Sequence, residues 1–211
     1  MRFFLFGIFL LMTSSPAYAH VPVIIEGLGQ SDVITIDDPD LSQAFYGEMA
    51  GFPHTYEIRI SEPLKLYAHI LVPDIESSKN NISGIIIKER IGGGRVTEIT
   101  RLLAKDGAWV SEYEPFGGDS YREGPQYETT LEPGTYRLEV NTPDNVEKYV
   151  LVVGTREEMT IGYFEMIQRL AKVKQFFGKP TIFIIQSPYV YVPLVIALLI
   201  YVWYRRRSRM K

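Results

Sequence analysis

The amino-acid sequence predicts a mainly β fold, an antiparallel β-sandwich, followed by an amphipathic helix and one C-terminal transmembrane helix. Three patterns support this prediction. Apolar and polar residues alternate in several short segments, turn residues separate those segments about every 8 to 12 positions, and residues 181–204 contain no charged side chain. No helical pattern lies between the alternating segments, which favours antiparallel pairing over a parallel sheet.

The clearest strands lie in residues 55–61 and 64–73. Both alternate apolar and polar residues with the period of a half-buried strand, and the turn pair Glu62 and Pro63 joins them into a hairpin. Residues 115–124 are rich in glycine and polar side chains, which is typical of a loop. Further strands are expected at residues 83–90, 96–103, 108–113, 127–131, 135–140 and 149–153.

The uncharged C-terminal segment, residues 180–204, is expected to cross a membrane. As a helix, its 24 residues from position 181 rise about 36 Å, enough for a hydrocarbon core of about 30 Å. Residues 205–211 are a basic tail with four arginines and one lysine. Because basic residues stay on the cytoplasmic side, we expect a cytoplasmic C-terminus, with everything before the span outside the cell membrane.

Residues 155–179 precede the span and are expected to form an amphipathic juxtamembrane helix. Its apolar stripe has two interpretations. The stripe packs on the sandwich, or it lies in the lipid interface just outside the span. Because the span begins only a few residues later, we favour the lipid interface.

The N-terminal residues 1–19 have the features of a secretory signal. A basic residue at Arg2 precedes an apolar run, and the small residues Ala17 and Ala19 define a cleavage site. Cleavage after Ala19 would make His20 the mature N-terminus. Residues 20–154 would then form one extracytoplasmic domain, periplasmic or extracellular.

Composition narrows the classes of function. The sequence has no cysteine, so neither disulfides nor thiolate metal sites contribute to its stability. Residues 20–179 contain 16 basic and 25 acidic side chains, a net charge of −9, which disfavours nucleic acid as a partner. No nucleophile elbow, zinc-protease or phosphate-loop motif occurs, so we do not expect an enzyme.

Two blocks of the sequence resemble a known family. The hairpin at residues 56–72, the segment PGTYRLEV at 133–140 and the segment YVLVV at 149–153 are similar to bacterial pre-peptidase C-terminal-type domains. The resemblance implies a jelly-roll-like sandwich that attaches to other envelope components without chemistry of its own. The Asp-x-Asp pattern of that family is replaced here by residues 53–55, so its calcium sites are not carried over.

Histidines suggest one metal site. If the signal is removed, the free amine and imidazole of His20 could chelate copper together with another imidazole, in the arrangement called a histidine brace. The other histidines are His54 and His69, and His69 is expected to point outward from its strand. The alternative is three unrelated surface histidines.

Acidic loops suggest calcium as a second cofactor, since that ion takes six to eight oxygen ligands. Solvated loop charge is the alternative, and no other cofactor is expected. The residues concerned are Asp32, Asp37, Asp38, Asp40, Glu112, Glu114 and Asp119.

The loop at residues 114–127 is expected to bind a partner, through Phe116, Tyr121 and Tyr127. Expected partners are membrane lipid and an envelope protein or glycan. The sequence therefore favours a single-pass envelope protein with a non-catalytic binding or assembly module. The alternatives are a copper-binding protein and a structural subunit of a larger membrane complex.

Overall fold

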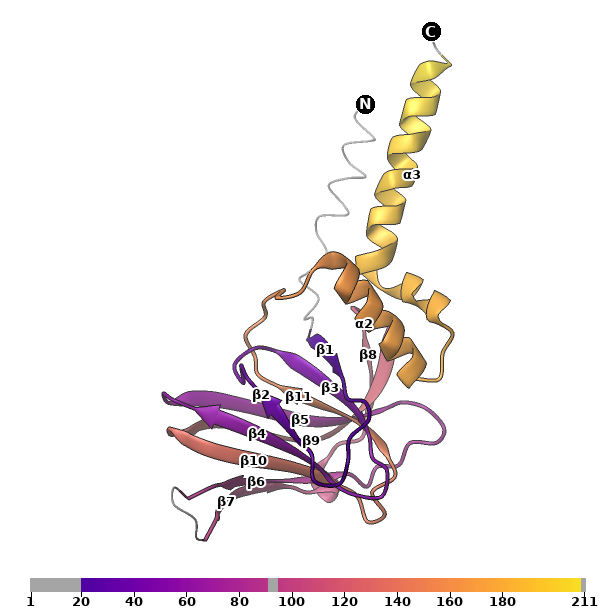
Figure 1. Cartoon of the computed structure of the whole chain (residues 1–211). Helices are drawn as coiled ribbons and strands as arrows, with labels where there is room; N and C mark the ends of the chain where they lie inside the picture. The colour runs from indigo at the N-terminus through magenta and orange to yellow at the C-terminus, as the bar shows by residue number, and fades with distance from the viewer. Residues whose placement is uncertain (1–19, 91–94, 210–211) are drawn as a thin grey trace.

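The computed structural model describes residues 20–90 and 95–209, and the predicted signal segment lies outside these residues. The described chain forms a sandwich of two sheets with helices at one end (Figure 1). The six-stranded sheet has the order β1-β3-β11-β5-β9-β8 and the five-stranded sheet has the order β2-β4-β10-β6-β7. The strands are β1 (Val21–Ile24), β2 (Val33–Ile36), β3 (Gln43–Glu48), β4 (His54–Ile60), β5 (Leu64–Pro73), β6 (Ser83–Lys88), β7 (Thr97–Leu102), β8 (Ser111–Glu114), β9 (Asp119–Leu131), β10 (Gly134–Asn141) and β11 (Lys148–Val153).

The predicted β-sandwich is confirmed, and its alternating strands place one residue in two inside. In β5, Leu66, Ala68 and Ile70 are fully buried between the sheets, whereas Tyr67 and His69 point to the outer face of the six-stranded sheet. The sandwich is mixed rather than wholly antiparallel. Strand β1 pairs in parallel with β3, and β2 pairs in parallel with β4. Both parallel strands are edge strands from the N-terminal arm, and alternation alone does not determine their direction.

The interior contains a chain of hydrogen bonds among aromatic side chains. The Tyr149 hydroxyl lies 2.8 Å from Nδ1 of His54 and 2.7 Å from the Tyr56 hydroxyl. Both tyrosines are fully buried, so these bonds satisfy polar atoms that water cannot reach. Gly47 makes room for the Tyr149 ring, because a Cβ at position 47 would lie 2.6 Å from it.

Strand β9 is longer than the sequence suggests. It begins at Asp119, inside residues 115–124 that were expected to be a loop, and runs for 13 residues. The prediction was wrong there because Gly124 and Pro125, which usually mark turns, form an irregularity within the strand. The register between β5 and β9 shifts between His69 and Leu71.

Helix α2 (Tyr163–Phe176) covers the outer face of the six-stranded sheet. Its buried residues include Met166, Leu170 and Val173, so the apolar stripe packs on the sandwich. For these buried residues, the expectation that the stripe lies in lipid was wrong. The helix also begins later than position 155, after Gly162, because Arg156 instead bonds to Asp38 and Asp40 of the preceding loops. The buried cluster between α2 and the outer face of this sheet comprises Ala44, Tyr46, Tyr121, Val150, Val152, Val173 and Phe177.

The predicted span divides into two elements. A 3₁₀ helix, η2 (Thr181–Gln186), comes first, and helix α3 (Pro188–Ser208) follows. The Ser187 side chain accepts a hydrogen bond from the Tyr189 N–H, and Pro188 occupies the first turn, so α3 starts at a defined cap. Helix α3 is long and apolar enough to cross a membrane. It extends away from the β-sandwich and α2, which together we call the head (Figure 1).

Candidate functional site

The joint between the head and α3 contains a buried ion cluster. Asp119 Oδ2 lies 2.8 Å from Nζ of Lys174 on α2, and its Oδ1 lies 2.7 Å from Nζ of Lys179. The Asp119 and Lys174 side chains are fully buried, whereas that of Lys179 is partly exposed. Lys174 also donates to the Gly118 carbonyl. Because a buried charge needs a partner, these bonds tie α2 and the segment after it to the turn between β8 and β9.

Glu114 shapes the same turn. Its carboxylate accepts hydrogen bonds from the N–H groups of Phe116 and Gly117, both at 2.6 Å. Burial raises the pKa of Glu114, and the two N–H donors partly offset that effect. The turn is therefore held by the carboxylate of its own first residue.

Aromatic rings join this turn to the base of α3. The rings of Phe116 and Tyr189 lie 5.7 Å apart, and Tyr189 also stacks on Tyr163 of α2 at 4.9 Å. A Cβ added at Gly118 would lie 2.8 Å from Gln186, so the backbone of the turn approaches η2 closely. The head is thus packed directly on the first turn of α3.

The predicted partner loop is largely engaged in these contacts. Tyr121 is buried under α2, and its hydroxyl lies 2.8 Å from that of Tyr46. Phe116 is half-buried against Tyr189, and Tyr127 packs on the interior core. These three aromatics therefore do not form one exposed surface: Tyr121 and Phe116 lie under segments that follow more than 40 residues later, and Tyr127 belongs to the interior.

The three histidines do not meet at one point. His54 faces the interior from the five-stranded sheet, bonded to Tyr149, and therefore lies apart from any outer site. His20 and His69 both belong to the six-stranded sheet. Nδ1 of His20 bonds to Ser42 Oγ at 2.5 Å, and Nδ1 of His69 lies 3.1 Å from the Tyr67 hydroxyl. The expected outward direction of His69 is confirmed.

Strand pairing explains why His20 and His69 lie on the same face of the sheet. Ser42 precedes Gln43, which pairs with Val153, and the next residue, Gly154, donates its N–H to the Tyr67 carbonyl. Gly154 carries no side chain, so nothing from that position separates Ser42 from Tyr67. We call His20, Ser42, Tyr67, His69 and Gln126 the histidine face.

Electrostatics keep the imidazoles of this face neutral. Burial, together with a smaller repulsive effect of the nearby His69 imidazole, lowers the pKa of His20 to about 4. Burial also lowers the pKa of His69, with the Gly124 carbonyl and Glu112 acting in the opposite direction. Neutral imidazole is the form that binds metal ions. Within residues 20–90 and 95–209, no three His, Asp or Glu side chains are positioned together as metal ligands.

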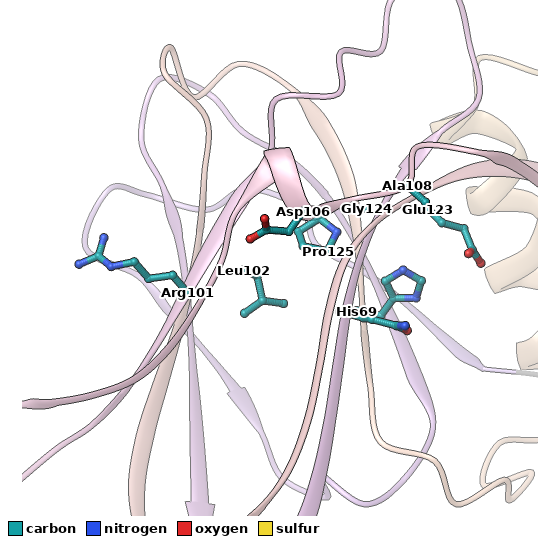
Figure 2. Close-up of a pocket in the computed structure, with 9 residues that line it drawn as sticks. His69, Arg101, Leu102, Asp106, Ala108, Glu123, Gly124 and Pro125 are labelled. Atoms are coloured by element: carbon teal, nitrogen blue, oxygen red, sulfur yellow. The ribbon is translucent and has the colours of Figure 1, made fainter.

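A pocket of about 190 Å³ adjoins the histidine face (Figure 2). Its charged side chains do not converge. Figure 2 shows His69 and Glu123 on one side of the strand ribbons and Arg101 and Leu102 on the other. The guanidinium of Arg101 is paired with Glu98 at 2.8 Å. The volume lies below the range of typical ligand pockets, so the pocket suits water or a small ion rather than a drug-sized molecule.

The strand irregularity borders this pocket, since Gly124 and Pro125 line it. Gly124 and Pro125 lie opposite the register shift in β5, and Pro125 has no N–H to donate to the ladder. A Cβ at Gly124 would lie 2.5 Å from the Ile70 carbonyl oxygen and 2.7 Å from the Trp109 ring. The backbone of β9 therefore approaches β5 more closely than any other residue would allow.

Several of the acidic residues named as possible calcium ligands have protein partners. Asp38 and Asp40 bind Arg156 at 2.5 and 2.8 Å. Asp32 accepts a hydrogen bond from the Gly29 N–H at 2.7 Å. Asp119 is paired with Lys174 and Lys179, so these carboxylates stabilise loops and the joint between the sandwich and α3.

Sequence reasoning missed Lys174 and the polar partners of the histidines. Lys174 lies eight positions after Met166 and four after Leu170, on the apolar stripe of α2. A lysine at that spacing was the available signal that a buried carboxylate lay opposite. No pattern in the sequence indicated that Ser42 or Tyr67 would lie beside a histidine, since strand pairing alone places them there.

No protein-family model matches this chain, and no curated protein does. Several solved structures are similar in fold. They include the pre-peptidase C-terminal domain of a Bacillus anthracis collagenase, at 12% identity and a TM-score of 0.36, covering 60% of this chain and 98% of that one. The Aeromonas hydrophila periplasmic inhibitor of g-type lysozyme has 12% identity and a TM-score of 0.36, covering 64% and 100%.

A third similar structure is CorA, a surface-associated copper-binding protein of Methylomicrobium album BG8, at 10% identity and a TM-score of 0.30, covering 59% of this chain and 98% of that one. The likeness to these proteins concerns the fold alone. The structures similar in fold thus include a pre-peptidase C-terminal domain, the family that the sequence resembles.

Proposed function

We propose that this chain is a single-pass envelope protein whose extracytoplasmic β-sandwich is a non-catalytic binding or assembly module held against the membrane. The observation that carries this proposal is the joint. The cluster of Asp119, Lys174 and Lys179 and the stacking of Tyr163 on Tyr189 fix the head to the first turn of α3. A head fixed in this way presents the same surfaces to its surroundings at all times.

The surface we assign to a partner is the exposed margin of the histidine face. Gln126 is exposed there and His20 and Tyr67 are partly exposed, whereas Ser42 and His69 are buried. Tyr67 links its two neighbours, because its hydroxyl lies 3.1 Å from His69 and 3.2 Å from Gln126. We assign partner binding to this face in place of the loop at residues 114–127.

Photo-crosslinking in living cells tests the assignment. A photoreactive residue at Gln126 should crosslink the full chain to an envelope protein or glycan. The matched control is the same residue at Arg59, which is exposed on the five-stranded sheet. Equal crosslinking at both positions, or none at Gln126, would contradict the assignment. Crosslinking confined to α3 would favour a structural subunit of a membrane complex.

Copper binding at the mature N-terminus is a second candidate. It is favoured by the placement of His20 and His69 on one face, where both imidazoles are held neutral. Removal of residues 1–19 would add a free amine as a third nitrogen donor. The amine and imidazole of His20 would then hold the ion, with His69 as the other imidazole.

Electron paramagnetic resonance of the mature protein with Cu(II) tests this candidate. A nitrogen-ligated signal should appear in the unmodified protein and disappear in His20→Ala and His69→Ala. The control is His54→Ala, since His54 faces the interior. A signal that survives His69→Ala, or that never forms, would rule out the site.

A further inference from the structure

An apolar surface surrounds the base of α3, and we propose that it inserts into the outer leaflet of the bilayer that α3 enters. We call it the collar. This inference deepens the proposed function and rests on it. The collar consists of Tyr163, Phe164, Ile182, Phe183 and Ile185.

The collar is exposed although it is apolar. Phe164 is 78% exposed and Ile182 is 70% exposed, values unusual for such large side chains. Tyr163 and Phe164 come from the first turn of α2, and the others come from η2. Two segments that are separate in the sequence therefore contribute to one apolar surface.

The length of α3 favours contact between lipid and this surface. From Pro188 to Tyr204, its uncharged part has 17 residues and rises about 26 Å. The hydrocarbon core of a bilayer is about 30 Å thick, so the uncharged part of α3 can cross it but falls about 4 Å short of its full thickness. The nearest apolar groups on the outer side are those of η2. Since residues 180–187 contain no charged side chain, the hydrocarbon boundary can extend over them at no cost in buried charge.

The joint holds the collar beside the first turn of α3, at the depth where the helix enters the hydrocarbon core. Lys179 binds Asp119 immediately before η2, and Tyr189 stacks on Tyr163 immediately after it. Gln186 also lies against Gly118. With both ends of η2 bonded to the head, its exposed face cannot withdraw into the sandwich. Figure 1 shows η2 beside the base of α3 rather than in line with it.

The occupant is lipid because the collar is continuous with the span. Its apolar face meets the first turn of α3, and a bilayer that surrounds α3 reaches that face without a gap. The acyl chains require no specific partner, which suits a surface of unpaired Ile and Phe side chains. The head carries a net charge of −9, so attraction to anionic headgroups does not contribute.

Single-cysteine labelling of the full chain tests the collar, because the natural sequence has no cysteine. A polarity-sensitive fluorophore is placed at Ile182→Cys or Phe164→Cys. Val96→Cys is the control, since it is exposed and apolar and immediately precedes β7, which lies at the other end of the sandwich from α3 (Figure 1). Leu198→Cys marks the span. The protein is studied in phosphatidylcholine nanodiscs, with and without lipids that carry a nitroxide quencher near the headgroup.

The collar probes should show blue-shifted emission and be quenched several-fold more than the Val96 probe. If they behave as the Val96 probe while the Leu198 probe responds to lipid, the collar is overturned and the span remains. If the Leu198 probe is also unresponsive, the proposed function itself fails. Blue-shifted emission at the collar without lipid quenching would mean that a second copy or another protein covers it, which overturns the inference as well.

Discussion

Asp119 Oδ2 and Lys174 Nζ lie 2.8 Å apart at a point where neither side chain is exposed to solvent. The two residues come from β9 and α2, so their contact joins the sheet to the helix that leads to α3. A buried pair of this kind contributes little when compared with an apolar pair, but removal of one partner leaves an uncompensated charge.

Lys174→Met should therefore destabilise the protein. Asp119 would keep only Lys179, which is partly exposed, so we expect a loss of about 3 kcal/mol. For a chain of this size, such a loss lowers the melting temperature by about 6 to 12 °C. Thermal unfolding of the full chain in detergent, followed by circular dichroism, measures the effect.

The control for this variant is Lys172→Met on the same helix. Lys172 pairs with Glu26 at the surface, where ion pairs contribute about 0 to 1 kcal/mol. Equal melting temperatures for the two variants would show that burial of the Asp119 pair has no special role.

Residue patterns predict where the strands of this fold lie better than they predict which strands pair with each other. The alternation in β4 and β5 identified both strands and the outward direction of His69, because the side-chain period of two is a local property. The parallel pairing of β1 with β3 and of β2 with β4 was missed, since tertiary contacts rather than local sequence determine the partner of an edge strand.

The candidate site was less predictable for the same reason. His20 and His69 were identified as residues of interest, but their separation from His54 depends on which sheet each strand joins. The sequence did not determine whether the loop aromatics Phe116 and Tyr121 are exposed, because no local pattern indicates that α2 and the base of α3 cover them.

Gly47→Ala should destabilise the interior. The added Cβ would lie 2.6 Å from the Tyr149 ring, which is held by hydrogen bonds to His54 and Tyr56 and has little freedom to move. Overpacking of this kind costs about 1 to 3 kcal/mol. The control is Gly162→Ala, where nothing lies within 4 Å of the added carbon. A lower melting temperature for Gly162→Ala than for Gly47→Ala would contradict the described packing.

Acid should weaken the protein through His20. Burial lowers its pKa to about 4, below the value of about 6.5 in an unfolded chain. Between these values the unfolded chain binds a proton that the folded chain excludes, so the free energy of unfolding decreases as the pH falls. The slope is at most about 1.4 kcal/mol per pH unit.

Melting curves of the mature protein at several pH values between 7.5 and about 4 test this sign. The decrease should be smaller in His20→Gln, which has no titrating group at that position. Parallel pH profiles for the two proteins would show that His20 is solvated in the folded state.

The central claim, a head outside the membrane anchored by α3, is tested most directly by labelling two engineered cysteines with a membrane-impermeant maleimide. Ser77→Cys is exposed on the head, and Ser208→Cys is the last residue of α3. In cells with a permeable outer membrane and an intact inner membrane, Ser77→Cys should react and Ser208→Cys should react only after lysis. Reaction at Ser208→Cys before lysis, or protection of Ser77→Cys, would contradict the account.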